Sequence, residues 1–188
     1  MFQFTVPNEI VGMCKSAFAQ GLNMGKRGKG DGNAIEQLWG VVGEVAVKNY
    51  IFEISHSFNE CSDGGYDLEY LGAKVDIKTK RANSVVQYHF EHNVLHFQKN
   101  YDLDGYIFVR INTNNLLLTV CGICYKDDFF KIARCDKAGT YKKPDRGEPF
   151  LVRDDMYSIY YNQIKDVSNA YELRKLIYQW QLKRIAKS

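Results

Sequence analysis

The chain has 188 residues, of which 45% are hydrophobic, and its formal net charge at neutral pH is +3. This length suits one domain over residues 1–188, and the slight positive charge permits a nucleic-acid partner without requiring one. No apolar run is long enough to cross a membrane, and no signal-like start is present, so we expect neither a membrane protein nor a secreted one. Five cysteines, an odd number outside a secretory context, favour reduced thiols in the cytoplasm.

The first element that the sequence predicts is a helix over residues 8–20, followed by a glycine-rich segment. Residues 21–32 contain five glycines, which exclude a helix or strand interior there. The same segment carries three cationic residues, Lys26, Arg27 and Lys29. They either contact a DNA backbone from a flexible basic loop or belong to an ordinary solvated loop, and the sequence leaves both interpretations open.

A second helix is predicted from Asn33 to about Asn49. Asn33 and Glu36 have the spacing of a capping box, and apolar residues follow at helical intervals. Gly43 lies inside this helix, where a small residue suits a close approach to a sheet or a ligand. Glu44 comes directly after it. A strand is expected next, over residues 51–58.

The clearest pattern is a hairpin between Tyr66 and Lys80, in which polar and apolar residues alternate on both sides of Leu71-Gly72. A two-residue loop with glycine in second place is a common hairpin connection. This loop predicts three strand pairs, Tyr70 with Ala73, Glu69 with Lys74 and Leu68 with Val75, and places Asp67 opposite Asp76. Leu68, Val75 and Ile77 then share one face, and the acidic and basic residues share the other.

That register places two carboxylates side by side, with Cβ atoms roughly 5 Å apart. Like charges this close repel each other unless a cation lies between them. Lys78 returns to the same face two residues after Asp76. Two acids that can hold a hard divalent metal, beside a lysine, form an arrangement suited to cleaving phosphodiesters. The alternative is a solvated hairpin face with ordinary Asp–Lys pairs.

The rest of the chain predicts further strands and one long helix. Residues 84–99 are expected to begin as a strand and continue as a helix. Strands are expected over residues 105–111, 116–125 and 157–161, a loop-rich polar segment over 126–150, and a helix from about 168 to 186. His92 and His96 have the spacing of a helical zinc pair, but surface histidines are the preferred interpretation. Cys121 and Cys124 are interpreted as core thiols, because no second cysteine pair follows them.

Asp67, followed after nine residues by Asp76-Ile77-Lys78, resembles the Asp…(Asp/Glu)-x-Lys signature of the restriction-endonuclease-like nucleases, the PD-(D/E)XK superfamily. Tyr66 stands where proline often precedes the first Asp in that family. The resemblance covers about residues 33–125 and includes the order of elements, which is similar to small phage-type members. It implies an α/β fold with an αβββαβ core, in which a mixed central sheet is flanked by helices.

The resemblance further implies a metal-dependent deoxyribonuclease, with endonucleolytic cleavage expected. Mg²⁺, for which Mn²⁺ would substitute, would be held by Asp67, Asp76, the carbonyl of Ile77 and Glu44 through water. Lys78 would orient or deprotonate the attacking water. DNA would be the partner, and its backbone contacts are expected from Lys26, Arg27, Lys29, Lys80 and Arg81. A homodimer and a location in the cytoplasm of a bacterial or phage-infected cell are also consistent with the resemblance.

Two alternatives stay open on the sequence. A non-catalytic descendant would keep the fold and bind DNA or a protein, although it would have no physical reason to hold two acids opposite each other. An unrelated cytoplasmic α/β protein would carry the same charges only as surface ion pairs. Stabilisation by metal would separate these alternatives from a nuclease, because paired acids that bind Mg²⁺ stabilise the folded state when the ion is added.

Overall fold

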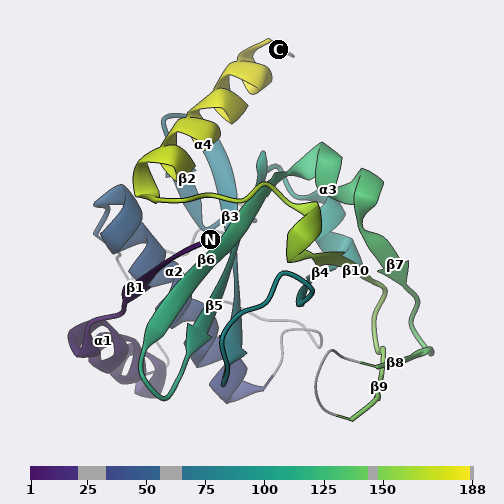
Figure 1. Ribbon diagram of the computed structural model, residues 1–188, viewed down its shortest axis with the longest axis horizontal. Coiled ribbons are helices and arrows are strands. Elements are labelled where there is room, and N and C mark those ends of the chain that lie inside the picture. Colours follow the sequence, from purple (N-terminus) through teal and green to yellow (C-terminus); the bar gives the residue numbers. More distant parts are fainter. Residues whose placement is uncertain (21–32, 56–64, 144–147, 187–188) are drawn as a thin grey trace.

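The computed structural model describes residues 1–20, 33–55, 65–143 and 148–186 and has a mixed α/β fold (Figure 1). Its helices are α1 (Asn8–Ala19), α2 (Ala34–Phe52), α3 (Lys126–Ile132) and α4 (Ala170–Ile185), with 3-10 helices η1 (His96–Asn100) and η2 (Tyr161–Gln163). Its strands are β1 (Phe2–Thr5), β2 (Leu68–Tyr70), β3 (Ala73–Ala82), β4 (Glu91–Leu95), β5 (Gly105–Asn112), β6 (Leu117–Tyr125), β7 (Arg134–Asp136), β8 (Tyr141–Lys142), β9 (Phe150–Leu151) and β10 (Met156–Tyr160). None of the described helices is long and apolar enough to cross a membrane.

A five-stranded mixed sheet in the order β1-β6-β5-β3-β2 forms the centre of the fold. β3 and β5 are parallel, whereas the other neighbours in this sheet are antiparallel. Because parallel neighbours need a long connection, the chain leaves the sheet after β3 and returns to it at β5. This connection contains β4 and η1.

The two faces of the central sheet carry separate hydrophobic clusters, as expected when successive side chains point to opposite sides of a strand. Ile107 and Val109 of β5 pack in the cluster that contains residues of α1 and α2. Tyr106 and Phe108 of the same strand pack in the cluster that contains residues of β4, α3 and β10. Figure 1 accordingly shows α1 and α2 on one side of the sheet and β4, β10 and β7 on the other.

Helix α2 begins with the predicted capping box. The side chain of Asn33 accepts from the Glu36 N–H at 3.0 Å, and the Glu36 carboxylate accepts from the Asn33 N–H at 3.0 Å. The helix continues beyond its predicted end to Phe52 and closes at Glu53, whose φ of 57° is left-handed. The predicted strand over residues 51–58 is therefore wrong at Ile51 and Phe52, and residues 56–58 lie outside the described chain. Ile51 and Phe52 are buried in the core, so tertiary packing outweighed their strand propensity.

The predicted strand-then-helix order over residues 84–99 is also wrong. The strand is β4, which comes later, and only the short η1 follows it. β4 pairs with β10, more than sixty residues further along the chain, from Glu91↔Tyr160 to Leu95↔Met156. The αβββαβ core would have a helical region after the hairpin. The structure has β4 there instead, in a second sheet with the strand order β4-β10-β7.

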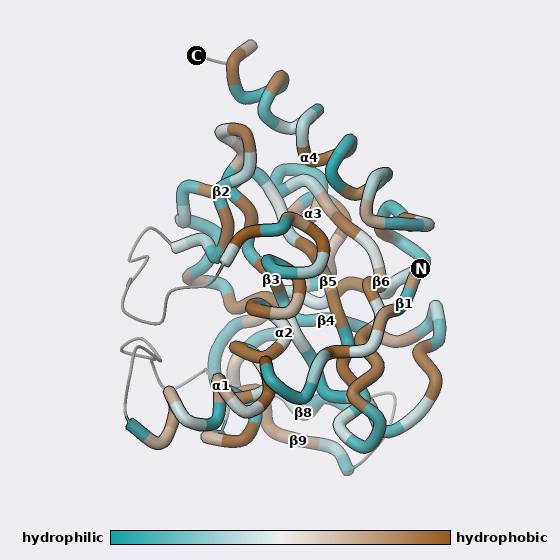
Figure 2. The backbone as a smooth tube through the Cα atoms, turned by 90° about the vertical axis from the view of Figure 1, so that its left-hand side faces the viewer, coloured by the Kyte–Doolittle hydropathy of each residue, from teal (hydrophilic) through white to brown (hydrophobic). Residues whose placement is uncertain are grey.

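The remaining predicted elements are present. β5, β6, β10 and α4 match their predicted ranges within about two residues. The segment 126–150, predicted as loop-rich, contains α3, β7 and β8. α4 buries Leu173, Ile177 and Trp180. Hydrophobic and hydrophilic residues alternate along this helix, and its C-terminal end projects beyond the rest of the molecule (Figure 2). The thiols of Cys121 and Cys124 are buried, and burial raises the pKa of each to about 12, as expected for core thiols.

Candidate active site

The hairpin of β2 and β3 has the predicted register. Leu68 pairs with Val75, Glu69 with Lys74 and Tyr70 with Ala73. The two loop residues, Leu71 and Gly72, have φ values of 51° and 83°, which is the combination that a type I′ turn requires. The predicted inner face is confirmed as well, because Leu68, Val75 and Ile77 are all buried in the core beneath α2.

Asp67 is fixed by β3 although it lies before the start of β2. Its N–H donates to the Val75 carbonyl at 3.0 Å, and its Oδ2 accepts from the Ile77 N–H at 2.7 Å. Both hydrogen bonds are made to β3, by Val75 and Ile77, the residues directly before and after Asp76. The carboxylate of Asp67 is therefore oriented by backbone groups rather than by solvent.

Asp76 lies on the opposite face of β3 from Val75 and Ile77, and its relative exposure is only 4%. Burial and the nearby Asp67 carboxylate raise its pKa to about 7, against the lowering effect of Lys78. Lys78 Nζ lies 2.6 Å from Asp76 Oδ2. The structure thus brings together Asp67, Asp76 and Lys78, and it buries one of the acids.

Tyr106 lies beside Asp76, as its register partner on β5. The ring is fully buried, and the hydroxyl is a buried polar atom without a hydrogen-bond partner. Burial, with the charge of Asp76 as the next cause, raises the pKa of Tyr106, so the hydroxyl keeps its proton. This hydroxyl therefore leaves unused hydrogen-bonding capacity on the Asp76 side of the sheet.

Glu44 is placed on the other side of the sheet. Its carboxylate lies 2.5 Å from Lys48 Nζ, and its charge adds to burial in raising the pKa of Cys14 of α1 to about 12. The adjacent Gly43 explains the close contact of α2 with β3, because a Cβ there would lie 2.2 Å from Thr79 Oγ1. Within the described ranges, no group of three or more His, Cys, Asp or Glu side chains could hold a metal ion, so Glu44 does not complete such a group with the two aspartates.

The donors that are present nevertheless suit a magnesium ion with few protein ligands. Mg²⁺ is commonly held by one or two carboxylates and keeps several of its waters. Asp67 and Asp76 supply two such carboxylates, and a cation beside them would offset the burial and the like charge that raise the pKa of Asp76.

Two of the expected DNA-contacting residues, Lys80 and Arg81, lie in the described chain and have different partners. Lys80 Nζ donates to the Glu91 carbonyl at 3.2 Å, on the same face of β3 as Asp76. Arg81 is more exposed, and its guanidinium lies 3.9 Å from the Glu36 carboxylate. Lys26, Arg27 and Lys29 lie outside the described residues.

The sequence did not predict the positions of two residues on the Asp76 side of the sheet, Arg110 and His92. Arg110 of β5 follows Tyr106 and Phe108 in the alternating pattern, which was the only available signal that it shares their face. His92 of β4 is packed against Phe108 with ring centroids 5.1 Å apart. It is almost fully buried, so the preferred interpretation of a surface histidine is wrong for it.

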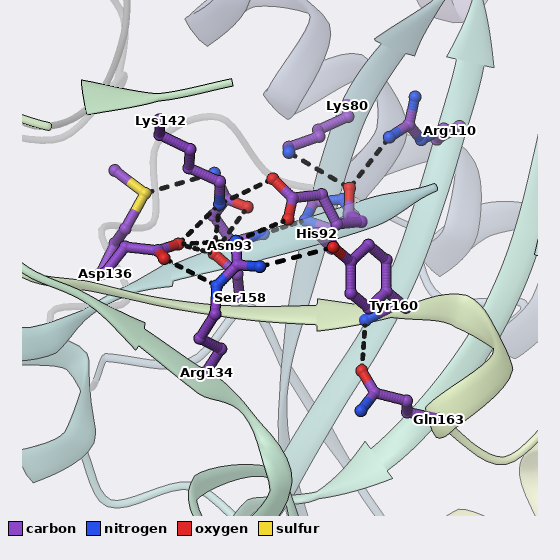
Figure 3. Close-up of polar contacts among 12 residues, drawn as sticks. Lys80, His92, Asn93, Arg110, Arg134, Asp136, Lys142, Ser158, Tyr160 and Gln163 are labelled. Carbon is purple, nitrogen blue, oxygen red and sulfur yellow. Dashed lines mark hydrogen bonds and ion pairs between the residues drawn. The ribbon is translucent and has the colours of Figure 1, made fainter. Parts of the chain in front are cut away.

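A buried ion network lies further out, in the second sheet (Figure 3). Lys142 Nζ is 2.7 Å from both the Glu91 and the Asp136 carboxylates and also donates to the Ser158 hydroxyl. Arg134 pairs with the same two acids. Burial raises the pKa of Asp136, but hydrogen bonds from Arg134, Lys142 and Ser158 lower it to about 2. The charges balance within the network, and we interpret it as structural.

Comparison of the chain with models of known protein families, with curated proteins and with solved structures finds no match. Asp67, Asp76 and Lys78 therefore stand out by their geometry and by the resemblance of their pattern to the nuclease signature.

Proposed function

We propose that this protein is a metal-dependent nuclease that hydrolyses phosphodiester bonds of DNA, with cleavage inside the strand as the expected mode. The observation that carries the proposal is the pair of carboxylates at the end of the hairpin, Asp67 and the buried Asp76. Burying one acid beside another is unfavourable unless cations neutralise both, and Lys78 supplies only one positive charge to the pair. The ion proposed is Mg²⁺, for which Mn²⁺ would substitute.

When bound, the metal would polarise the scissile phosphate and lower the pKa of a bound water. Asp67 would hold it with a carboxylate oriented by the Ile77 N–H, and Asp76 would hold it with the oxygen that now contacts Lys78. The ammonium group of Lys78 would then face the reacting phosphate, where it would orient the attacking water and offset the negative charge that develops. Any contribution of Glu44 would be indirect, through water or through the position of α2.

Cleavage of supercoiled plasmid by the purified protein tests the proposal. The reaction would be run in Mg²⁺, in Mn²⁺ and in EDTA, with Asp76→Asn and Lys78→Gln beside the wild type. Glu69→Gln is the matched control, because Glu69 is an exposed acid on the same hairpin, paired in register with Lys74 rather than with the site. Circular and linear single-stranded DNA would be included as substrates.

Metal-dependent cleavage that falls at least about 100-fold in Asp76→Asn and in Lys78→Gln, and that Glu69→Gln retains, would support the proposal. Cleavage that survives Asp76→Asn would contradict the assigned site. If no protein cleaves any substrate, and all bind DNA with the same salt dependence, the non-catalytic alternative takes its place.

A further inference from the structure

A row of cationic side chains continues from the proposed site along the same face of the sheet. Lys78 and Lys80 alternate with inward-facing residues on β3, and Lys80 is the register partner of Arg110 on the parallel strand β5. All three residues are partly exposed. Lys80 and Arg110 therefore lie side by side, about 13 Å from Asp76 at the usual rise of a strand.

The guanidinium of Arg110 is held rigidly, and its hydrogen-bond partners are neutral. Nε donates to the Tyr161 hydroxyl at 2.8 Å, and Nη2 donates to the Glu91 carbonyl at 2.9 Å. The group also lies over the rings of Phe90 and Tyr161, at 4.8 and 5.4 Å from their centroids. Among the described residues Arg110 makes no ion pair, and these two bonds leave part of its five-donor fork unused.

Glu91 lies between this row of cations and the second sheet. The backbone carbonyl of Glu91 faces Lys80 and Arg110, whereas its carboxylate is held by Lys142 and Arg134 in the second sheet (Figure 3). The positive charges of Lys80 and Arg110 also act on the neighbouring His92. Burial, followed by the charges of Lys80 and Arg110, holds its pKa well below the usual range.

We propose that Arg110 and Lys80 form a phosphate clamp that binds a phosphodiester group of the nucleic-acid strand, a few nucleotides from the bond that is cut at Asp67 and Asp76. This inference rests on the proposed nuclease function and deepens it by assigning a second contact to the substrate. A rigid guanidinium with free donors matches the oxygens of a phosphate, and a lysine beside it adds a point charge. The clamp would fix the register of the strand relative to the carboxylates and would not touch the reacting atoms.

The first experiment measures binding of a fluorescent single-stranded oligonucleotide by anisotropy, in EDTA so that no strand is cut. Arg110→Gln and Lys80→Gln would be compared with Lys15→Gln, which removes an exposed lysine from α1 on the opposite face of the sheet. Arg110→Gln is expected to weaken binding about 5- to 10-fold. It should also reduce the slope of log K against log salt by about 0.7, the value for one lost contact to a single strand. Lys15→Gln should change neither quantity.

The second experiment locates the contact with oligonucleotides in which one phosphodiester at a time is replaced by a neutral methylphosphonate. At one position the replacement should weaken wild-type binding as much as Arg110→Gln does, and it should have no further effect on that variant. Arg110→Lys, which keeps the charge but loses the planar fork, should recover part of the affinity. Melting temperatures would be measured for every variant, and Lys80→Gln tests the clamp without disturbing the ring contacts of Arg110.

The outcomes separate the two proposals. If Arg110→Gln and Lys80→Gln bind with wild-type affinity and salt slope while the wild type cleaves DNA, the clamp is wrong and the nuclease stands. If the wild type neither binds nor cleaves nucleic acid, the proposed function is wrong, and the clamp is wrong with it. Loss of affinity that is equal at every neutral position would also overturn the clamp, because it would reflect general charge rather than one contact.

Discussion

At the level of single residues, Asp76 combines a buried position with charged neighbours of both signs. Its pKa of about 7 lies well above the ordinary value for an aspartate, with burial as the main cause. In the unfolded chain the same group would lose its proton near pH 4. The folded state therefore binds a proton that the unfolded state has released between about pH 4 and pH 7, and stability falls as the pH rises through this window.

The Asp76→Asn variant is expected to remove this dependence. In metal-free buffer its free energy of unfolding should be similar to that of the wild type at pH 5 and higher by about 1–3 kcal/mol at pH 8, since the amide carries no charge to bury. Urea unfolding of both proteins between pH 5 and pH 8 measures the difference. A gap between them that stays constant with pH would show that Asp76 is ionised in the folded state throughout.

Ionised Asp76 lowers the stability of the folded protein, and added Mg²⁺ is expected to restore it by binding this carboxylate. An ion that binds only the folded state stabilises it by RT ln(1 + [L]/Kd), or about 1.4 kcal/mol at ten times the dissociation constant. The wild type should therefore melt at a higher temperature in Mg²⁺ than in EDTA, whereas Asp76→Asn should show little change. Glu69→Gln, on the exposed part of the hairpin, should respond as the wild type does. An equal response of all three proteins would exclude binding at the carboxylate pair.

At the level of elements, the position of α2 on β3 depends on the absence of one side chain. Gly43 and Gly40 both lie inside the helix, but their surroundings differ. A Cβ at Gly43 would be only 2.2 Å from Thr79 Oγ1, whereas a Cβ at Gly40 would have no atom within 4 Å. The glycine at 43 is thus required by the contact between helix and sheet, and the one at 40 is tolerated at a cost to the helix.

The two glycines form a matched pair for a test. Gly43→Ala is expected to destabilise the protein by about 1–3 kcal/mol, because the extra methyl group overpacks the interface with Thr79. Gly40→Ala should stabilise it by about 0.5–1 kcal/mol through helix propensity. Chemical denaturation gives both values. A Gly43→Ala variant as stable as the wild type would contradict this expectation. Gly43→Ala combined with Thr79→Ala, which removes the Oγ1 nearest to the new methyl group, should recover part of the loss.

At the scale of the whole molecule, polar side chains from four distant parts of the chain join the second sheet to β8. Glu91, Asp136, Lys142 and Ser158 come from β4, β7, β8 and β10, and their side chains meet in one buried network. Breaking a buried pair is costly because it leaves the remaining charge unpaired, whereas an exposed pair contributes little. The network should therefore determine how firmly β8 is held on the sheet.

Lys142→Ala is expected to destabilise the protein by about 3–5 kcal/mol, since two largely buried carboxylates lose a shared partner. Lys137→Ala, which removes an exposed ion pair with Asp155, should cost no more than about 1 kcal/mol. Thermal or chemical unfolding compares the two variants. Equal effects would mean that the network contributes no more than a surface pair.

Much of the local structure was predictable from the sequence, because it depends on groups within a few residues of each other. The capping box of α2, the turn at Leu71-Gly72 and the register that follows from it are all of this kind. The predicted pair of Asp67 with Asp76 lies beyond this register, and hydrogen bonds of Asp67 to Val75 and Ile77 of β3 hold it near Asp76. Hydrogen bonds and φ preferences over so short a span leave few alternatives.

The sequence by itself thus determined the hairpin, its pair of acids and the helices with strong caps. The tertiary structure alone decided that Asp76 is buried, that the charge of Glu44 acts on Cys14 of α1, and that residues around His92 form a strand. It also decided that Arg110 lies beside Lys80. These features depend on which distant segments pack against each other, and alternation along one strand gives the face of a residue but not the neighbour that covers it.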